Sequence, residues 1–170
     1  ERAKHQFVVA MEAKPEFVRI DPNNERVLKL DFNPGEDMLR AQLTEAPDVV
    51  GRILAGEVLV GTNKRKNIEA VRQAWDAEPF WGVRRQWALA LGDSGTEAAL
   101  EALLELASSE RDPMVLEAFL GALASYRDAR VREALEALLA DELPYRARMA
   151  ALRGLGAQRD GSAHEKLVVA

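Results

Sequence analysis

The pair His164-Glu165 is the part of the sequence that most strongly suggests catalytic chemistry. A helix that binds catalytic zinc reads HExxH, because a second histidine four residues after the first puts both imidazoles on one helix face. Position 168 is Val168, and the other histidine, His5, lies far away in sequence. Cysteine is absent, which excludes thiolate ligands and disulfides. We therefore predict no catalytic, cofactor-binding or metal-binding residue in this sequence.

Two sets of charged side chains could form a binding surface. Carboxylates on the second helices of the predicted pairs could line a site for cationic peptide ends, or form a solvated face with i,i+4 pairing. Arginines farther along could clamp a peptide carboxylate in bidentate fashion, or pair with the acidic helices beside them. We favour the structural interpretation for both sets. The carboxylates are Glu97, Glu101, Glu105, Glu133, Glu136, Asp141 and Glu142, and the arginines are Arg127, Arg130, Arg132, Arg146, Arg148, Arg153 and Arg159.

An aromatic cluster surrounds one junction between predicted helical pairs. It consists of Trp75, Phe80, Trp81 and Trp87. Such residues can form a binding platform, but large aromatics at helical spacing usually fill a core. We predict core packing and keep the binding platform as the alternative. No phosphate-binding glycine motif is present, because the glycines at 92 and 95 lie in a predicted helix-to-helix turn with no strand before them.

Composition limits the classes of partner. The 170 residues carry a formal net charge of −5, which gives no electrostatic footprint for nucleic acid or an anionic membrane. No apolar run reaches the roughly 18 residues of a membrane-spanning helix. We therefore expect neither nucleic acid nor a membrane as partner. These features assign no cellular compartment.

A unit of two amphipathic helices occurs twice within residues 83–138, at an offset of 32 residues. The same offset links Leu91 to Leu123 and Leu155, so a third copy is still running when the sequence stops. We expect these three leucines to occupy equivalent buried positions on successive helices. On the other helix of each unit the repeated positions are Leu103, Leu135 and Leu167, and a weaker upstream copy contains Leu59, Ile68 and Val71.

This periodicity predicts a mainly α fold. Repeats of this length, with two helices each, are typical of a HEAT-like α-solenoid, an α-α superhelix. Each unit alone leaves an apolar face uncovered, and stacking the units buries those faces against one another. Short loops between the helices imply antiparallel neighbours.

The N-terminal residues have a different pattern. Apolar and β-branched residues in 5–12, 15–20 and 26–32 predict two or three strands, with a turn at 21–24. So small a sheet is marginal alone, so we expect these strands to finish a β-sandwich begun before Glu1. We divide the sequence into residues 1–33, the terminal strands of that β-domain, and residues 34–170, the helical repeat domain.

Punctuation residues predict the helix boundaries. Asn33 is a candidate N-cap with Pro34 as the first helical residue, and Pro47-Asp48 starts the next helix. Further breaks are expected at 61–63, 78–82, 92–96, 111–113, 125–128 and 143–144.

Four stretches carry a resemblance to a known family: 14–22, 27–32, 39–43 and 47–52. They resemble the late region of the zinc metallo-aminopeptidases related to aminopeptidase N. In that family the end of a small β-sandwich leads into a C-terminal helical domain, often HEAT-like, that follows the catalytic domain. The resemblance extends over roughly residues 7–156.

The resemblance implies a function for a longer parent chain. The family's HExxH, its downstream glutamate ligand and its GxMEN motif have no counterpart in this sequence, so no catalytic residue can be assigned. The resemblance implies a noncatalytic C-terminal part that helps enclose or gate a peptide-substrate chamber. Zinc would then belong to the parent's catalytic domain, and the partners would be the parent's catalytic and β-sandwich domains and its peptide substrates. The alternative is a HEAT-repeat scaffold for protein interaction, and an independent enzyme domain is disfavoured.

Overall fold

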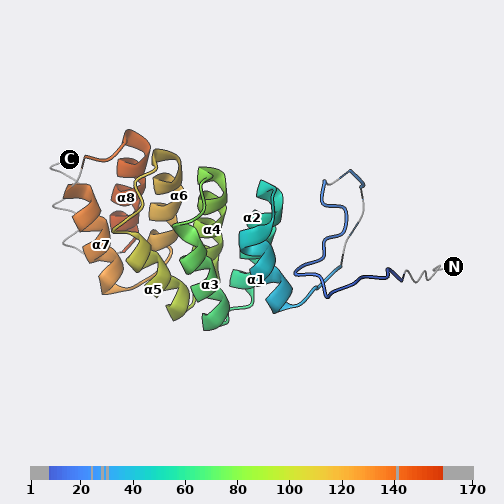
Figure 1. Cartoon of the computed structure of the whole chain (residues 1–170). Helices are drawn as coiled ribbons and strands as arrows, with labels where there is room; N and C mark the ends of the chain where they lie inside the picture. The colour runs from blue at the N-terminus through green and yellow to red at the C-terminus, as the bar shows by residue number, and fades with distance from the viewer. Residues whose placement is uncertain (1–7, 24, 28, 30, 141, 159–170) are drawn as a thin grey trace.

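The computed structural model describes residues 8–23, 25–27, 29, 31–140 and 142–158 (Figure 1). These residues contain eight helices in two layers, and each helix packs beside the one two places along in the chain. One layer holds α1, α3, α5 and α7, and the other holds α2, α4, α6 and α8. The helices are α1 (Glu36–Glu45), α2 (Val49–Gly61), α3 (Arg65–Trp75), α4 (Trp81–Ser94), α5 (Glu97–Leu106), α6 (Pro113–Ala124), α7 (Ala129–Ala140) and α8 (Tyr145–Ala157).

Side-chain caps fix several helix starts. The carboxylate of Asp48 accepts a hydrogen bond from the Gly51 N–H at 2.8 Å, and the Asp112 carboxylate accepts one from the Met114 N–H at 2.9 Å. Each cap satisfies a backbone donor that has no partner within the helix. Between α4 and α5 the chain turns sharply at Gly95, whose φ of 64° is left-handed and favours glycine.

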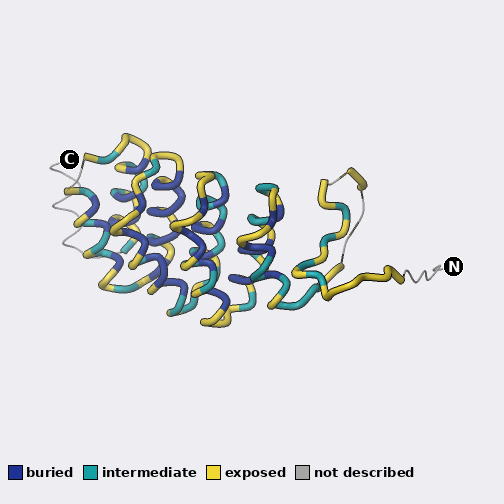
Figure 2. Tube along the Cα trace, viewed as in Figure 1, coloured by how far each residue is buried: buried dark blue, intermediate teal, exposed yellow. Residues whose placement is uncertain are grey.

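The core lies between the two layers (Figure 2). The apolar positions of the 32-residue register lie within this core. Leu91, Leu123 and Leu155 are 0%, 0% and 1% exposed, and Leu103 and Leu135 are each 0% exposed. The expected equivalence of these buried positions is therefore confirmed. The mainly helical, HEAT-like prediction is confirmed with it.

The two layers are packed unequally. A Cβ atom at Gly92 of α4 would lie 2.8 Å from the Ala122 Cβ of α6, and one at Gly154 of α8 would lie 2.8 Å from the Ala124 Cβ. Small residues therefore let α4, α6 and α8 approach closely, and their mutual contacts are more extensive than those between α3, α5 and α7. Closer spacing on one side bends a stack toward that side. We infer that α2, α4, α6 and α8 form the inner face of the array.

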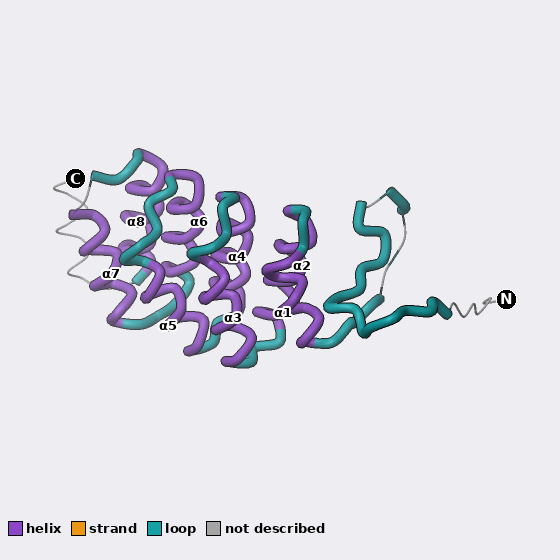
Figure 3. Tube along the Cα trace, viewed as in Figure 1, coloured by secondary structure: helices purple, strands orange, loops and turns teal. Residues whose placement is uncertain are grey.

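The predicted N-terminal strands are not confirmed. Among the described residues of 8–35 none is in a strand (Figure 3), and residues 5–7, 28 and 30 lie outside the described part. A strand needs a neighbour for its backbone groups, and this segment instead uses side-chain acceptors. The Asp21 carboxylate accepts from the N–H groups of Glu25 and Arg26 at 3.1 and 3.0 Å, which forms the turn predicted there.

Some predicted boundaries were wrong by a few residues. Helix α1 begins at Glu36 with Gly35 as N-cap, whereas Asn33 holds the preceding turn by accepting the Gly35 N–H at 2.9 Å. Helix α4 begins at Trp81 and continues through Gly92. Inside the helix this glycine allows close packing against α6. The residues His5, His164, Glu165, Val168, Arg159 and Asp141 lie outside the described residues.

Candidate protein-binding groove

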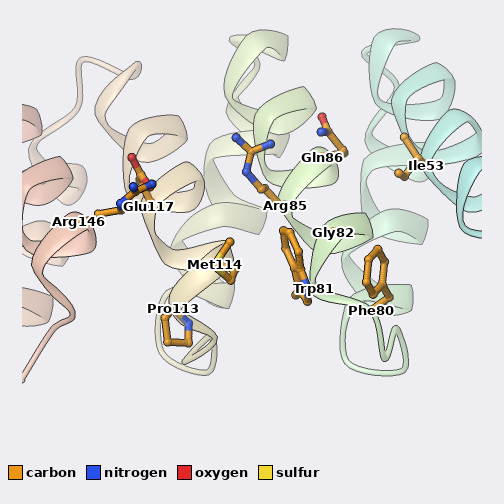
Figure 4. Close-up of a pocket in the computed structure, with 10 residues that line it drawn as sticks. All are labelled: Ile53, Phe80, Trp81, Gly82, Arg85, Gln86, Pro113, Met114, Glu117 and Arg146. Atoms are coloured by element: carbon orange, nitrogen blue, oxygen red, sulfur yellow. The ribbon is translucent and has the colours of Figure 1, made fainter.

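A groove of about 650 Å³ crosses α2, α4, α6 and α8 on the inner face (Figure 4). Apolar side chains form much of its surface, with charged groups along one side. We call it the inner groove. Its lining residues are Ile53, Phe80, Trp81, Gly82, Arg85, Gln86, Pro113, Met114, Glu117 and Arg146.

The repeat itself positions these side chains. Trp81, Met114 and Arg146 are the first or second residues of α4, α6 and α8, so they lie at the same end of parallel helices. The rings of Phe80 and Trp81 are 5.4 Å apart between centroids. Gly82 is required beside them, because a Cβ there would lie 2.5 Å from the Phe80 ring. The groove wall is therefore a packed aromatic pair rather than two isolated side chains.

In the array, large exposed apolar side chains belong to the inner layer of helices, where Phe80, Trp81 and Met114 line the groove and Leu54 and Val58 lie on the open side of α2. Within the described part of residues 36–158, every large apolar residue that is exposed belongs to α2, α4, α6 or α8 or directly precedes α4. A contiguous exposed apolar surface on a water-facing protein commonly marks an interaction site. The residues are Val50, Leu54, Val58, Phe80, Trp81, Leu89, Met114 and Tyr145.

The aromatic cluster divides between core and surface. Trp75 and Trp87 are 2% and 0% exposed, and the Trp87 Nε1–H donates to the Arg52 carbonyl at 3.1 Å. In contrast, Phe80 and Trp81 are 39% and 36% exposed and line the groove. Core packing was the right prediction for the first two residues and the wrong one for the second two. Only the position of neighbouring helices decides between them.

The charged residues of the opposite layer mostly pair between successive repeats. Arg65 of α3 contacts Glu101 of α5 at 2.6 Å, and Arg130 of α7 contacts Glu97 of α5 at 2.7 Å. The hydrogen bond from Arg65 lowers the pKa of the Glu101 carboxyl. Such exposed pairs add little stability each. Three further ion pairs are Arg72–Glu105 at 2.9 Å, Arg132–Glu136 at 4.0 Å and Arg146–Glu117 at 3.8 Å. Arg127 donates to the Ala157 carbonyl. The remaining described members of the two predicted sets, Glu133, Glu142, Arg148 and Arg153, are exposed.

Two buried ion pairs were missed by the sequence analysis. Arg52 of α2 contacts Glu78 at 2.7 Å, and Arg84 of α4 contacts Glu110 at 3.0 Å. Each glutamate is 5% exposed and lies in the loop before the next inner helix. Both members recur at the 32-residue offset, a signal that the sequence contained. In the next repeat Leu116 replaces the arginine, and Glu142 is exposed.

A further arginine–carboxylate pair, outside the 32-residue register, joins Arg19 of the N-terminal segment to α2. Its guanidinium donates to the Asp48 carboxylate and, at 3.1 Å, to the Pro22 carbonyl. Burial raises the pKa of the Asp48 carboxyl, but hydrogen bonds from Arg19 and the Gly51 N–H outweigh it, so the pKa lies below its ordinary value of 3.8. The segment around Arg19 is thus tied to α2 by a carboxylate that must stay ionised.

We expect this tie to be lost in acid. Because the folded-state pKa of Asp48 is lowered, its ionised carboxylate stabilises the attachment of the N-terminal segment to α2 above about pH 4. This stabilisation is lost as the pH falls through the lowered pKa. A spin label on the variant Glu16→Cys, in a chain without other cysteines, should become mobile below pH 4. Asp48→Asn keeps the α2 N-cap and should give a mobile label already at pH 7. An immobile label in that variant would contradict the tie.

A family model described as HEAT repeats matches residues 36–124, which include α1 to α6. No curated protein matches the sequence. Within the described residues, no group of three or more His, Cys, Asp or Glu side chains is arranged to hold a metal ion. No helix in that part of the chain combines the length and apolarity needed to cross a membrane.

Proposed function

Because the chain belongs to the HEAT-repeat family, we propose that it is a noncatalytic scaffold that binds a segment of a partner protein in the inner groove. The observation that carries this proposal is the one-sided distribution of exposed apolar residues. Stacked repeats present an extended concave surface, and binding surfaces in solenoids lie along it. Aromatic side chains such as Trp81 are also enriched in protein interfaces. The net charge of −5 favours neither nucleic acid nor an anionic membrane as the partner.

The test compares two phenylalanines of equal exposure. Phe80 lines the groove, whereas Phe32 lies in the N-terminal segment, and both are 39% exposed. Peptides selected from a random library for binding to the purified chain should bind Phe80→Ala at least about tenfold more weakly, since anchors that cost 1.4 kcal/mol or more change affinity by that factor. Phe32→Ala should bind them normally. Selected peptides that respond equally to both substitutions would contradict binding in the groove.

A second candidate is the function implied by the aminopeptidase resemblance, and one face of α2 favours it. Val50, Leu54 and Val58 are 40%, 45% and 49% exposed. At twice the 32-residue offset, Leu54 and Val58 match Ala118 and Ala122 of α6, which are 8% and 5% exposed beside the preceding inner helix, whereas Val50 matches Met114 in the groove lining. A domain that precedes the array would cover this α2 face.

In this second candidate, residues 1–33 complete a β-domain, and residues 34–170 help enclose the peptide chamber of a parent chain. Zinc and the peptide substrate would be bound by the parent's catalytic domain. The test is whether the parent carries an HExxH motif and loses turnover of long peptides, but not of single aminoacyl dyes, when it is truncated near Phe32. A parent without that motif would contradict this candidate.

A further inference from the structure

Arg85 is the charged residue at the centre of the inner groove. It lies on α4 one helical turn after Trp81, and Figure 4 shows it above Trp81, between Glu117 and Gln86. Among the residues that the structure describes, it has no ion-pair or hydrogen-bond partner for its side chain. The other groove arginine, Arg146, faces Glu117 at 3.8 Å. The groove therefore holds one guanidinium whose charge is not matched by the chain itself.

Among the described arginines, Arg26, Arg148 and Arg153 also have no ion-pair or hydrogen-bond partner for their side chains, but they are exposed, whereas Arg85 is half-buried. Arg52, Arg84 and Arg130 each contact a carboxylate of a neighbouring element. The groove lining carries two arginines and one glutamate, a net charge of +1, although the whole chain has a net charge of −5. A half-buried guanidinium among apolar groups is stabilised most by a carboxylate that accepts two hydrogen bonds from it.

The surroundings fix where such a carboxylate can lie. A second hollow on the same face shares Gln86 with the groove, but Glu57 and Asp93 line it and would repel an anion. The apolar wall continues on both sides of Arg85, toward Ile53 and toward Met114. A bound chain would therefore pass Arg85 rather than end there, which favours a side-chain carboxylate over a terminal one.

We propose that the inner groove binds a partner segment in which apolar residues flank an aspartate or glutamate, and that Arg85 selects for that acidic residue. This inference rests on the proposed scaffold function and specifies its ligand. Packed helices are about 8–10 Å apart, so the three intervals from α2 to α8 span about 24–30 Å. An extended segment rises about 3.3 Å per residue, so about seven to nine residues cross the groove.

The experiment uses three libraries of nine-residue peptides, acetylated and amidated at their ends, with apolar-rich flanks and a central Glu, Gln or Lys. We expect the purified chain to bind the Glu library about tenfold more tightly than the Gln library, in line with a charge-assisted hydrogen bond. Arg85→Gln should abolish this preference, and Arg85→Glu should shift it to the Lys library. Arg148→Gln removes one exposed arginine outside the groove and should leave the preference unchanged.

The other outcomes distinguish failure of the proposed role of Arg85 from failure of the proposed scaffold function. Equal binding of the Glu and Gln libraries, with binding still weakened by Phe80→Ala, would overturn the role of Arg85 and leave the scaffold function standing. A preference that persists in Arg85→Gln would also overturn that role. If a Gln library with free C-terminal carboxylates binds as tightly as the Glu library, the segment ends at Arg85 and the proposal is wrong. Binding of no library would overturn both the inference and the proposed function.

Discussion

Glu110→Ala should destabilise the protein by about 3–5 kcal/mol, the usual cost of removing one partner of a buried ion pair. One oxygen of this carboxylate accepts hydrogen bonds from the Arg84 guanidinium and the Trp75 indole N–H, both at 3.0 Å. The other accepts from the backbone N–H groups of Arg111 and Asp112 at 3.0 and 2.8 Å. The substitution therefore removes the acceptor of the indole and the nearest carboxylate of the guanidinium, which keeps the Glu78 carbonyl at 2.7 Å and the Asp112 carboxylate at 3.5 Å. Urea unfolding followed by circular dichroism measures the loss.

Two variants separate this effect from a general loss of charge. Glu105 also pairs with an arginine, at 2.9 Å, but its side chain is 60% exposed, so Glu105→Ala should cost less than about 1 kcal/mol. Adding Arg84→Leu to Glu110→Ala should recover part of the loss, because the guanidinium that has lost its nearest carboxylate is then removed. Leucine occupies the corresponding position 116 of the next repeat. Equal costs for Glu110→Ala and Glu105→Ala would show that the buried pair has no special role.

The repeat architecture could be predicted because its cause is local in sequence. The apolar positions that include Leu91, Leu123 and Leu155 recur at one offset, and each is buried by the same neighbours in successive repeats. Asp48 likewise caps its helix through the backbone a few residues on. Such contacts lie within one or two helices, so a pattern of single residues is enough to predict them.

The groove could not be predicted in the same way. Trp81 and Trp87 lie six residues apart on one helix, and both fit an apolar helical pattern. One is 36% exposed and the other 0%, because Trp87 packs into the core against Gly56 of α2 and Trp75 of α3, whereas Trp81 lies in the first turn of α4 and lines the groove. Likewise Leu54 of α2 is 45% exposed, although its equivalent Ala118 of α6 is 8% exposed beside α4, because no described inner helix precedes α2. Burial on a stacked array depends on which neighbours are present, and one sequence does not state that.

In the N-terminal segment the sequence pattern predicts strands that the described residues do not form. Its alternating apolar residues predict strands, yet its described backbone is tied to α2 through the side chain of Arg19. Strand propensity describes how a side chain fits a pleated surface and requires a partner strand to be realised. Val8, Val9 and Val27 are 84%, 77% and 109% exposed, so no such surface covers them here.

Leu123→Ala should lower the stability by about 2–5 kcal/mol, the range observed when a buried leucine is truncated. Leu123 is 0% exposed and lies on α6, which packs against α4 on one side and α8 on the other. In a stacked array each repeat is stabilised by its interfaces with its neighbours, so a cavity in α6 weakens two interfaces at once. The midpoint of urea unfolding should therefore fall clearly.

The control is Leu89→Ala, the same chemical change on the inner face of α4, where the leucine is 37% exposed. Its loss should stay near 0.5 kcal/mol, roughly the limit for surface substitutions away from special features. Leu89 lies outside the lining of the inner groove, so this variant should also keep the binding of selected peptides. If the two substitutions lower stability equally, the 32-residue register would not describe the energetic core. If Leu123→Ala alone unfolds α6 and α8 and leaves α1 to α4 helical, the repeats would be stabilised one interface at a time.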